Sequence, residues 1–174
     1  MESFEQLDAY LRATPGRWRI AYTNEQLDEE IEDLCRAARA LGDCLLVLEE
    51  ADMFCSPSFI PRELYNLVQY GRPRPSQRGA HLLATSRSPH DVNRALTRQA
   101  YEIYCFTTQE PSDLKYLRDY VGDAFAADLE TLPPLHYRYQ NLWDRTRAIE
   151  ERELTIPASR NPPAGVEEAE PTIA

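Results

Sequence analysis

Two adjacent carboxylates, Glu49 and Glu50, directly follow the longest apolar run of the chain. That run, residues 44–48 with the sequence CLLVL, contains five apolar residues without alternation. Such a run predicts a strand buried on both faces of a helix-covered parallel sheet. Ligands bind at the carboxyl ends of strands in these sheets, where carboxylates can bind Mg²⁺ or polarise water. The other interpretation is structural, since an acid such as Asp52 can also cap the next helix.

Polar side chains also follow a second apolar segment, residues 81–85, where Ser86 and Arg87 occur in the sequence HLLATSRSP. If this segment is the neighbouring parallel strand, its polar end lies beside Glu49 and Glu50. In nucleotide-hydrolysing sheets, side chains at this position sense the γ-phosphate. The sequence therefore predicts that acids and sensor residues meet at one edge of a sheet.

The order of these parts resembles a known family. The stretch from LLVLEEADMF through GRPRPSQRGAHLLATSRSPHDVNRALTRQAYEIYCFTTQEPSDLKYL is similar to the FtsK/HerA-type branch of P-loop ATPases. It is most similar to the bacteriophage members, which include DNA-packaging and zonula-occludens-toxin-like ATPases. The resemblance covers residues 44–121 and, more loosely, the chain from Ser3. It implies ATP hydrolysis coupled to DNA translocation or packaging, with ATP and Mg²⁺ as cofactors, in the cytoplasm (the host cytoplasm for a phage protein).

The resemblance also implies roles for individual residues. Glu49 matches the metal-associated acid, which is normally Asp, and Glu50 matches the catalytic glutamate. Ser86 falls where the family commonly has a polar sensor, often Gln, and Arg87 matches the arginine that follows it. Arg98 falls where ring ATPases place an arginine that reaches the nucleotide of a neighbouring subunit.

The phosphate-binding motif of this class, G-x-x-x-x-G-K-[ST], does not occur in the 174 residues. None of the six glycines precedes a lysine, and Lys115, the single lysine, is expected in a downstream helix. The loop's amides and lysine carry most of the phosphate affinity, so the chain is expected to be inactive alone. A homo-oligomeric ring or a partner chain that supplies the loop would then be needed, with DNA as a further partner of the assembled motor.

Two other functional interpretations stay open. The chain can be a non-catalytic accessory or interaction protein derived from such an ATPase. The segment 49–53, EEADM, also resembles the acid motif of DEAD-box helicases, although no second RecA-like domain is expected after residue 132.

Composition and charge exclude several other classes. The net charge of −10 opposes general binding to nucleic acid, yet residues 72–98 carry six arginines against one acid. No apolar run is long enough to cross a membrane, and the N-terminus has no signal-peptide pattern. The four separated cysteines suggest reduced thiols, and the three histidines lack zinc-site spacing.

The alternation of strand and helix patterns predicts an α/β fold with a mostly parallel sheet flanked by helices. The resemblance implies that this fold is an incomplete RecA-like P-loop NTPase core. We expect residues 1–156 to form the partial ATPase domain and the Pro/Glu-rich residues 157–174 to form a disordered tail. The family order places the phosphate-loop strand between segments 81–85 and 101–106, so a missing central strand is expected to leave an open slot there. The expected elements are helices over 3–13, 24–42, 61–70, 89–99 and 113–132, and strands over 18–22, 44–48, 81–85, 101–106 and, at the edge, 136–140.

Overall fold

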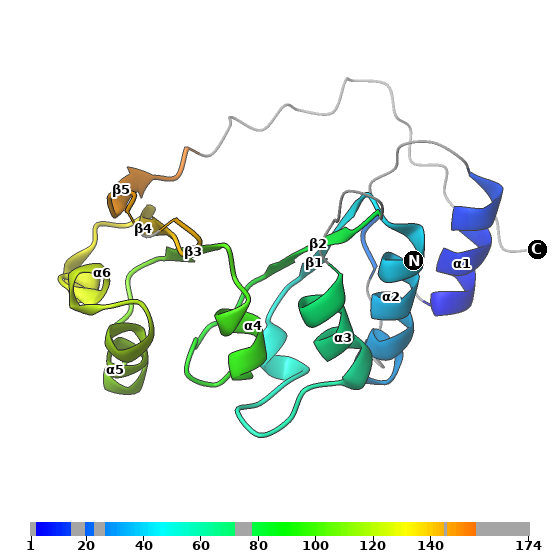
Figure 1. Cartoon of the computed structure of the whole chain (residues 1–174), viewed down its shortest axis with the longest axis horizontal. Helices are drawn as coiled ribbons and strands as arrows, with labels where there is room; N and C mark the ends of the chain where they lie inside the picture. The colour runs from blue at the N-terminus through cyan, green and yellow to red at the C-terminus, as the bar shows by residue number, and fades with distance from the viewer. Residues whose placement is uncertain (1–2, 15–19, 23–26, 72–77, 145, 156–174) are drawn as a thin grey trace, which may run out of the picture.

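The chain alternates helices and strands around two separate sheets (Figure 1). The computed structural model describes residues 3–14, 20–22, 27–71, 78–144 and 146–155. The helices are α1 Phe4–Ala13, α2 Leu27–Leu41, α3 Arg62–Tyr70, α4 Arg94–Arg98, α5 Pro111–Tyr120 and α6 Asp123–Ala126, with short 3-10 turns η1 Ala51–Met53 and η2 Leu129–Thr131. The strands are β1 Cys44–Leu48, β2 Ala80–Ala84, β3 Glu102–Cys105, β4 His136–Asn141 and β5 Glu150–Glu153.

A helix-covered parallel pair forms the first sheet. β1 pairs with β2 in a register that runs from Cys44 opposite Ala80 to Leu48 opposite Ala84. Helices α2 and α3 pack together against one face of this pair. The core between them contains the fully buried side chains Ile31, Cys35 and Leu64. The predicted α/β class, with a parallel pair flanked by helices, is confirmed.

The prediction that β1 is buried on both faces is wrong. Leu45 and Val47 are 59% and 47% exposed, and Leu83 on β2 is 45% exposed. The inward side chains of β1 face α2 and α3, whereas nothing in the described part of the chain covers the opposite face. An apolar run makes burial of both faces of a strand possible, but burial also requires other segments that pack against each face. The apolar run itself does not specify those segments.

The second sheet is antiparallel, which the sequence did not suggest. β4 lies in the middle, between β3 and β5, so the prediction of residues 136–140 as an edge strand is wrong. Helices α5 and α6 and turn η2 pack against one face through Leu117, Phe125 and Leu129. Figure 1 shows this unit at one end of the long axis, with α1 and α2 at the other end.

The other helix and strand boundaries differ in detail. The helix expected over 89–99 is only α4, because the side chain of Asn93 accepts a hydrogen bond from the Ala95 N–H and starts the helix there. Helices are expected across residues 113–132, and the structure has α5, α6 and the 3-10 turn η2 there. A strand is expected over residues 18–22, but residues 20–22 are not in a strand. Residues 18 and 19 lie outside the described residues. Residues 157–174 and the start of helix 24–42 also lie outside the described residues.

Glycine ends α2 as its position predicts. Gly42 has φ +60°, and its N–H donates to the Ala38 carbonyl at 3.1 Å. A Cβ atom at Gly42 would lie 2.6 Å from the Cβ of Arg78, so both the turn and the close approach require glycine. This turn aims the chain from α2 directly into β1.

Segments 81–85 and 101–106 do not pair with each other. They belong to different sheets, and among the described residues no backbone hydrogen bond joins them. The alternative in which these strands close up directly is therefore excluded, while a missing central strand remains a prediction. None of the described helices has the length and apolar character needed to cross a membrane.

Candidate nucleotide-hydrolysis edge

The carboxyl ends of β1 and β2 are joined by backbone hydrogen bonds. The Thr85 N–H donates to the Leu48 carbonyl at 2.9 Å, and the Ala51 N–H donates to the Thr85 carbonyl at 2.8 Å. The Thr85 hydroxyl accepts a third bond, from the Glu50 N–H at 3.1 Å. The loop after β1 and the loop after β2 therefore meet at one edge, as the sequence predicts.

The acid pair is held in a specific backbone turn. Glu50 has φ 51° and ψ 55°, a left-handed conformation that costs a non-glycine residue about 1–2 kcal/mol. The hydrogen bond from its N–H to Thr85 stabilises this conformation. The side chains of Glu49 and Glu50 are both exposed. The turn therefore presents two adjacent carboxylates to solvent at the edge of the sheet.

Arg87 contacts the acid loop through Asp52. Both its Nε and its Nη2 donate to Asp52 Oδ2, at 3.2 and 3.0 Å, and its backbone N–H donates to Oδ1 at 3.4 Å. The Asp52 side chain is 9% exposed and that of Arg87 is 68% exposed. Burial raises the pKa of Asp52, but hydrogen bonds from Arg87, the backbone and Ser86 outweigh burial and leave this pKa below its ordinary value. The structure thus gives Asp52 a partner across the loops, whereas the sequence suggested a helix cap.

A buried carboxylate on α5 holds the loop after β2. Asp113 is 2% exposed, and its Oδ1 accepts from the Ser88 hydroxyl at 2.7 Å and from the His90 N–H at 3.1 Å. Ser88 in turn donates its N–H to the Ser86 hydroxyl at 3.1 Å. Sequence reasoning noticed Asp113 only as part of the segment EPSDLKYL, and its role as a loop anchor was missed.

We call the sheet edge where Glu49, Glu50, Ser86 and Arg87 lie the acid edge. Arg98 does not lie at this edge. It is exposed in the last turn of α4, and no ion pair within the described ranges involves it. Glu102, the acid that follows α4 in the chain, accepts hydrogen bonds from the Tyr104 and Tyr139 hydroxyls at 2.7 and 3.0 Å. Of the five predicted site residues, the structure therefore brings together Glu49, Glu50, Ser86 and Arg87.

The acid edge fits Mg²⁺ only as a partial ligand set. In the described residues, no three His, Cys, Asp or Glu side chains form a cluster that could hold a metal. Mg²⁺ in nucleotide sites commonly uses one or two carboxylates, with water and phosphate oxygens as the other ligands. The exposed carboxylates of Glu49 and Glu50 are compatible with that arrangement.

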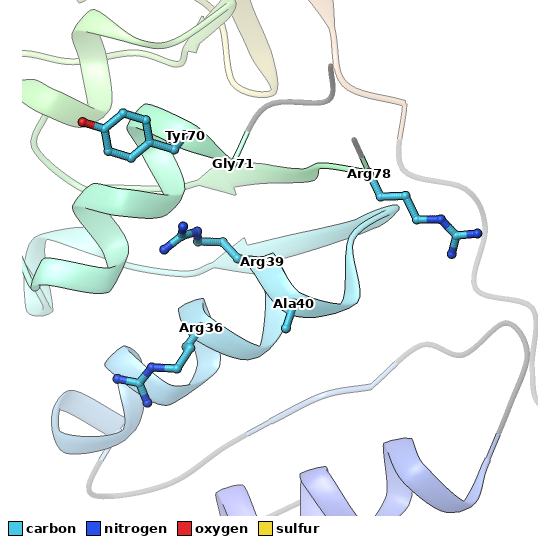
Figure 2. Close-up of a pocket in the computed structure, with 6 residues that line it drawn as sticks. All are labelled: Arg36, Arg39, Ala40, Tyr70, Gly71 and Arg78. Atoms are coloured by element: carbon cyan, nitrogen blue, oxygen red, sulfur yellow. The ribbon is translucent and has the colours of Figure 1, made fainter. Parts of the chain in front are cut away.

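A pocket of about 300 Å³ lies away from this edge, at the amino-terminal ends of β1 and β2 (Figure 2). Its lining residues come from the ends of α2 and α3 and from the segment before β2. Three of them are the arginines Arg36, Arg39 and Arg78. Each arginine forms an ion pair, with Asp33, Glu63 and Asp43 respectively. Because their charges are locally balanced, these arginines do not form an evident phosphate site.

The chain has an α/β fold in which helices cover a parallel pair of strands, and this fold matches part of the fold of solved NTPases. Solved structures of the genome-packaging NTPase B204 of Sulfolobus turreted icosahedral virus 2 match it. The complex with ATP-gammaS has a TM-score of 0.64 and 19% identity, over 76% of this chain and 66% of B204. The complex with AMPPCP has a TM-score of 0.66 and 19% identity, over 78% of this chain and 65% of B204.

B204 of Sulfolobus Turreted Icosahedral Virus, a DNA-packaging ATPase, matches with a TM-score of 0.59 and 17% identity, over 84% of this chain and 79% of that protein. No family model and no curated protein matches the sequence. At these identities the likeness shows the fold, which agrees with the resemblance expected from the sequence. The chain spans about two thirds of the length of the virus 2 NTPase.

Proposed function

We propose that this chain is the acid- and sensor-bearing part of an ATPase that drives the packaging or translocation of DNA. The observation that carries the proposal is the joined edge, where Glu49 and Glu50 follow β1 and Ser86 and Arg87 follow the adjacent parallel β2. The fold likeness to viral packaging NTPases supports it, since two of the matched structures contain nucleotide analogues.

In this proposal Glu49 binds Mg²⁺ and Glu50 polarises the attacking water. Mg²⁺ supplies charge neutralisation at the phosphates. The fixed turn at Glu50 positions its carboxylate, because the N–H bond to Thr85 holds the backbone. Ser86 and Arg87 sense the γ-phosphate, and Arg87 must then exchange its bond with Asp52 for a bond to phosphate. Arg98 acts on the nucleotide of a neighbouring subunit, and DNA and a ring of subunits are the partners.

The phosphate loop has to come from residues outside these 174. The chain has no G-x-x-x-x-G-K-[ST] sequence, and Lys115 is exposed on α5. We therefore expect the isolated chain to bind Mg-ATP weakly or not at all. Isothermal titration is the direct check, and micromolar affinity for Mg-ATP would contradict this part of the proposal.

Hydrolysis is tested in a fusion that places a strand, a phosphate loop and its following helix ahead of this chain. The expected result is Mg-dependent ATP hydrolysis that disappears when the lysine of the added loop is changed to Ala. Glu49→Gln should weaken the binding of Mg²⁺, so that hydrolysis requires a higher Mg²⁺ concentration. Glu130→Gln, at an exposed glutamate in η2, is the matched control and should leave hydrolysis unchanged. A folded fusion that binds ATP but does not hydrolyse it would refute the catalytic role of this edge.

The exposed face of β1 and β2 favours a second candidate, a non-catalytic accessory protein that docks on a related motor. Leu45, Val47 and Leu83 form an apolar surface there, which in soluble proteins often marks an interaction site. If the fusion hydrolyses ATP and this hydrolysis depends on Glu50, the non-catalytic accessory function is rejected. Stable binding to a complete motor without any gain of hydrolysis would support it.

A further inference from the structure

The cationic side chains of α4 and α5 differ from most others in the described part of the chain, because no acid pairs with them. Most of the other described Lys and Arg side chains form ion pairs with Asp or Glu. The unpaired side chains on the two helices are all exposed, and they are Arg94, Arg98, Lys115 and Arg118. Arg62 on α3 is the one further exception among the described residues. In a chain with a net charge of −10, α4 and α5 therefore carry a local surplus of positive charge that attracts acidic groups.

Two of these cations line a groove between α4 and α5. The groove has a volume of about 210 Å³, and it is lined by Arg94, Thr97, Arg98, Tyr116, Asp119 and Tyr120. The rings of Tyr116 and Tyr120 stack with their centroids 5.9 Å apart. The Tyr116 hydroxyl lies 2.6 Å from the Thr97 hydroxyl, and the Tyr120 hydroxyl donates to the Thr97 carbonyl. The groove is therefore preformed, with fixed rings on α5 and guanidinium groups on α4.

The chemistry of the groove suits a short acidic segment with small apolar side chains. Its volume lies below the usual range for small-molecule pockets, so it accommodates one or two side chains rather than a whole ligand. Guanidinium groups bind carboxylates in a bidentate manner, and tyrosine rings offer apolar faces to aliphatic side chains. One lining residue, Asp119, is acidic, so the two arginines leave the lining net positive.

The chain itself contains such a segment. Residues 166–170 have the sequence VEEAE, in which three glutamates alternate with the small apolar residues Val166 and Ala169. Only one of the stretches outside the described residues, 156–174, contains more than one acid. A Pro- and Glu-rich stretch forms no core of its own, so a surface of opposite charge is the contact open to it. Residues 166–170 therefore match the groove in charge and in side-chain size.

The length of the connection allows this segment to reach the groove. The last described residue, Thr155, comes just after β5, which pairs with β4 in the sheet that α5 packs against. Residues 156–166 join Thr155 to Glu167, and a connection of this length spans up to about 40 Å when extended. A small domain is about 30 Å across. The connection also keeps the segment at a millimolar effective concentration, so a contact made of weak exposed ion pairs is populated.

We propose that residues 166–170 dock on the α4–α5 groove of the same chain. The glutamates of the segment bind Arg94 and Arg98, and its small apolar side chains pack against the two tyrosine rings. Lys115, one residue before Tyr116 on α5, lies beside the groove and attracts the same glutamates. The docked segment covers Arg98, which the proposed function assigns to the nucleotide of a neighbouring subunit. That regulatory consequence rests on the proposed function, whereas the docking itself needs neither nucleotide nor the acid edge.

Lys115 makes the contact directly testable, because it is the single lysine of the 174 residues. A water-soluble carbodiimide joins an amine to a carboxylate when the two are in contact, so peptide mass mapping identifies the acids that lie next to Lys115. In the full chain at about 5 μM and low salt, we expect Lys115 to couple to the glutamates of residues 166–170 within one copy. Raising the salt to about 0.5 M shortens the screening length to about 4 Å and should reduce this coupling by about tenfold.

Variants of the groove distinguish docking from random encounter. Arg94→Gln removes one cation of the groove but keeps Lys115, so the coupling should fall by about fivefold. Arg62→Gln, at the unpaired arginine on α3, is the matched control and should leave the coupling unchanged. In nuclear magnetic resonance spectra, the full-length variant E167Q/E168Q/E170Q should shift the amide signals of α4 and α5 but not those of α2. Circular dichroism verifies that each variant is folded.

Several results would overturn the proposal. Lys115 could couple only to acids outside residues 166–170, or the coupling could be equal in Arg94→Gln and Arg62→Gln. Products that join two copies would show that the segment occupies the groove of a second chain instead. Amide signals of α4 and α5 that stay unchanged in the glutamine variant would also contradict the docking. None of these measurements involves nucleotide or DNA, so their outcome is independent of the proposed hydrolysis at the acid edge.

Discussion

Removing the buried carboxylate of Asp113 should destabilise the chain and loosen the loop after β2. Asp113→Ala leaves the Ser88 hydroxyl and the His90 N–H without the acceptor that lies 2.7 and 3.1 Å away. A hydrogen bond to a charged group contributes about 1.5–3 kcal/mol. Since Asp113 is only 2% exposed, solvent replaces these bonds poorly. We expect the free energy of unfolding to fall by about 3 kcal/mol.

Urea denaturation followed by circular dichroism measures this change. With a slope of about 2 kcal/mol per molar, the midpoint should fall by about 1.5 M. Ser88→Ala should lower the free energy of unfolding by about 1 kcal/mol. The double variant should lose less than the sum of the two single losses, because both substitutions remove the same hydrogen bond between Ser88 and Asp113. Asp119→Ala, at an exposed aspartate on the same helix, should change the midpoint little. A loss below about 0.5 kcal/mol in Asp113→Ala, or strict additivity with Ser88→Ala, would refute the anchoring role.

Other predictions concern Asp52 and Cys35. The pKa of Asp52 is lowered in the folded chain, so its contribution to stability is present above the ordinary aspartate pKa and is lost as the pH falls below it towards the folded value. Asp52→Asn should therefore flatten the fall of the unfolding free energy in that acidic window, and an unchanged pH profile would count against the Arg87 contact. Burial, with smaller contributions from Glu32 and Glu63, raises the pKa of Cys35 to about 12. In native protein at pH 8, iodoacetamide should leave Cys35 unmodified until urea unfolds the chain, and rapid labelling of Cys35 in the native chain, located by peptide mass mapping, would show that the α2–α3 core opens readily.

The sequence predicted the acid edge because the relevant signals are local. An apolar run followed by acids, and a second run followed by Ser86 and Arg87, place polar groups at strand ends whatever the remaining fold. The connection between these ends was also predictable in outline. The bonds that fix it, such as Glu50 to Thr85, join residues 35 positions apart and require coordinates.

The second sheet was harder to predict for a different reason. β5 has the sequence EERE and is exposed at every position, so it carries no apolar alternation. Its pairing with β4 depends on backbone hydrogen bonds and on contacts such as Arg152 with Tyr139. Similarly, the exposure of Leu45 and Val47 depends on which surfaces pack against β1, a property that composition does not contain.

The most direct test of nucleotide hydrolysis at this edge compares Glu50→Gln with the unchanged chain in the ATP-binding fusion. Single-turnover hydrolysis and nucleotide affinity should be measured in the same preparation. If Glu50 polarises the attacking water, the hydrolysis rate should fall by about 10²–10⁴-fold while the dissociation constant for Mg-ATP changes little. Equal hydrolysis rates in the two proteins would contradict the assignment of Glu50, and with it the proposed chemistry of the edge.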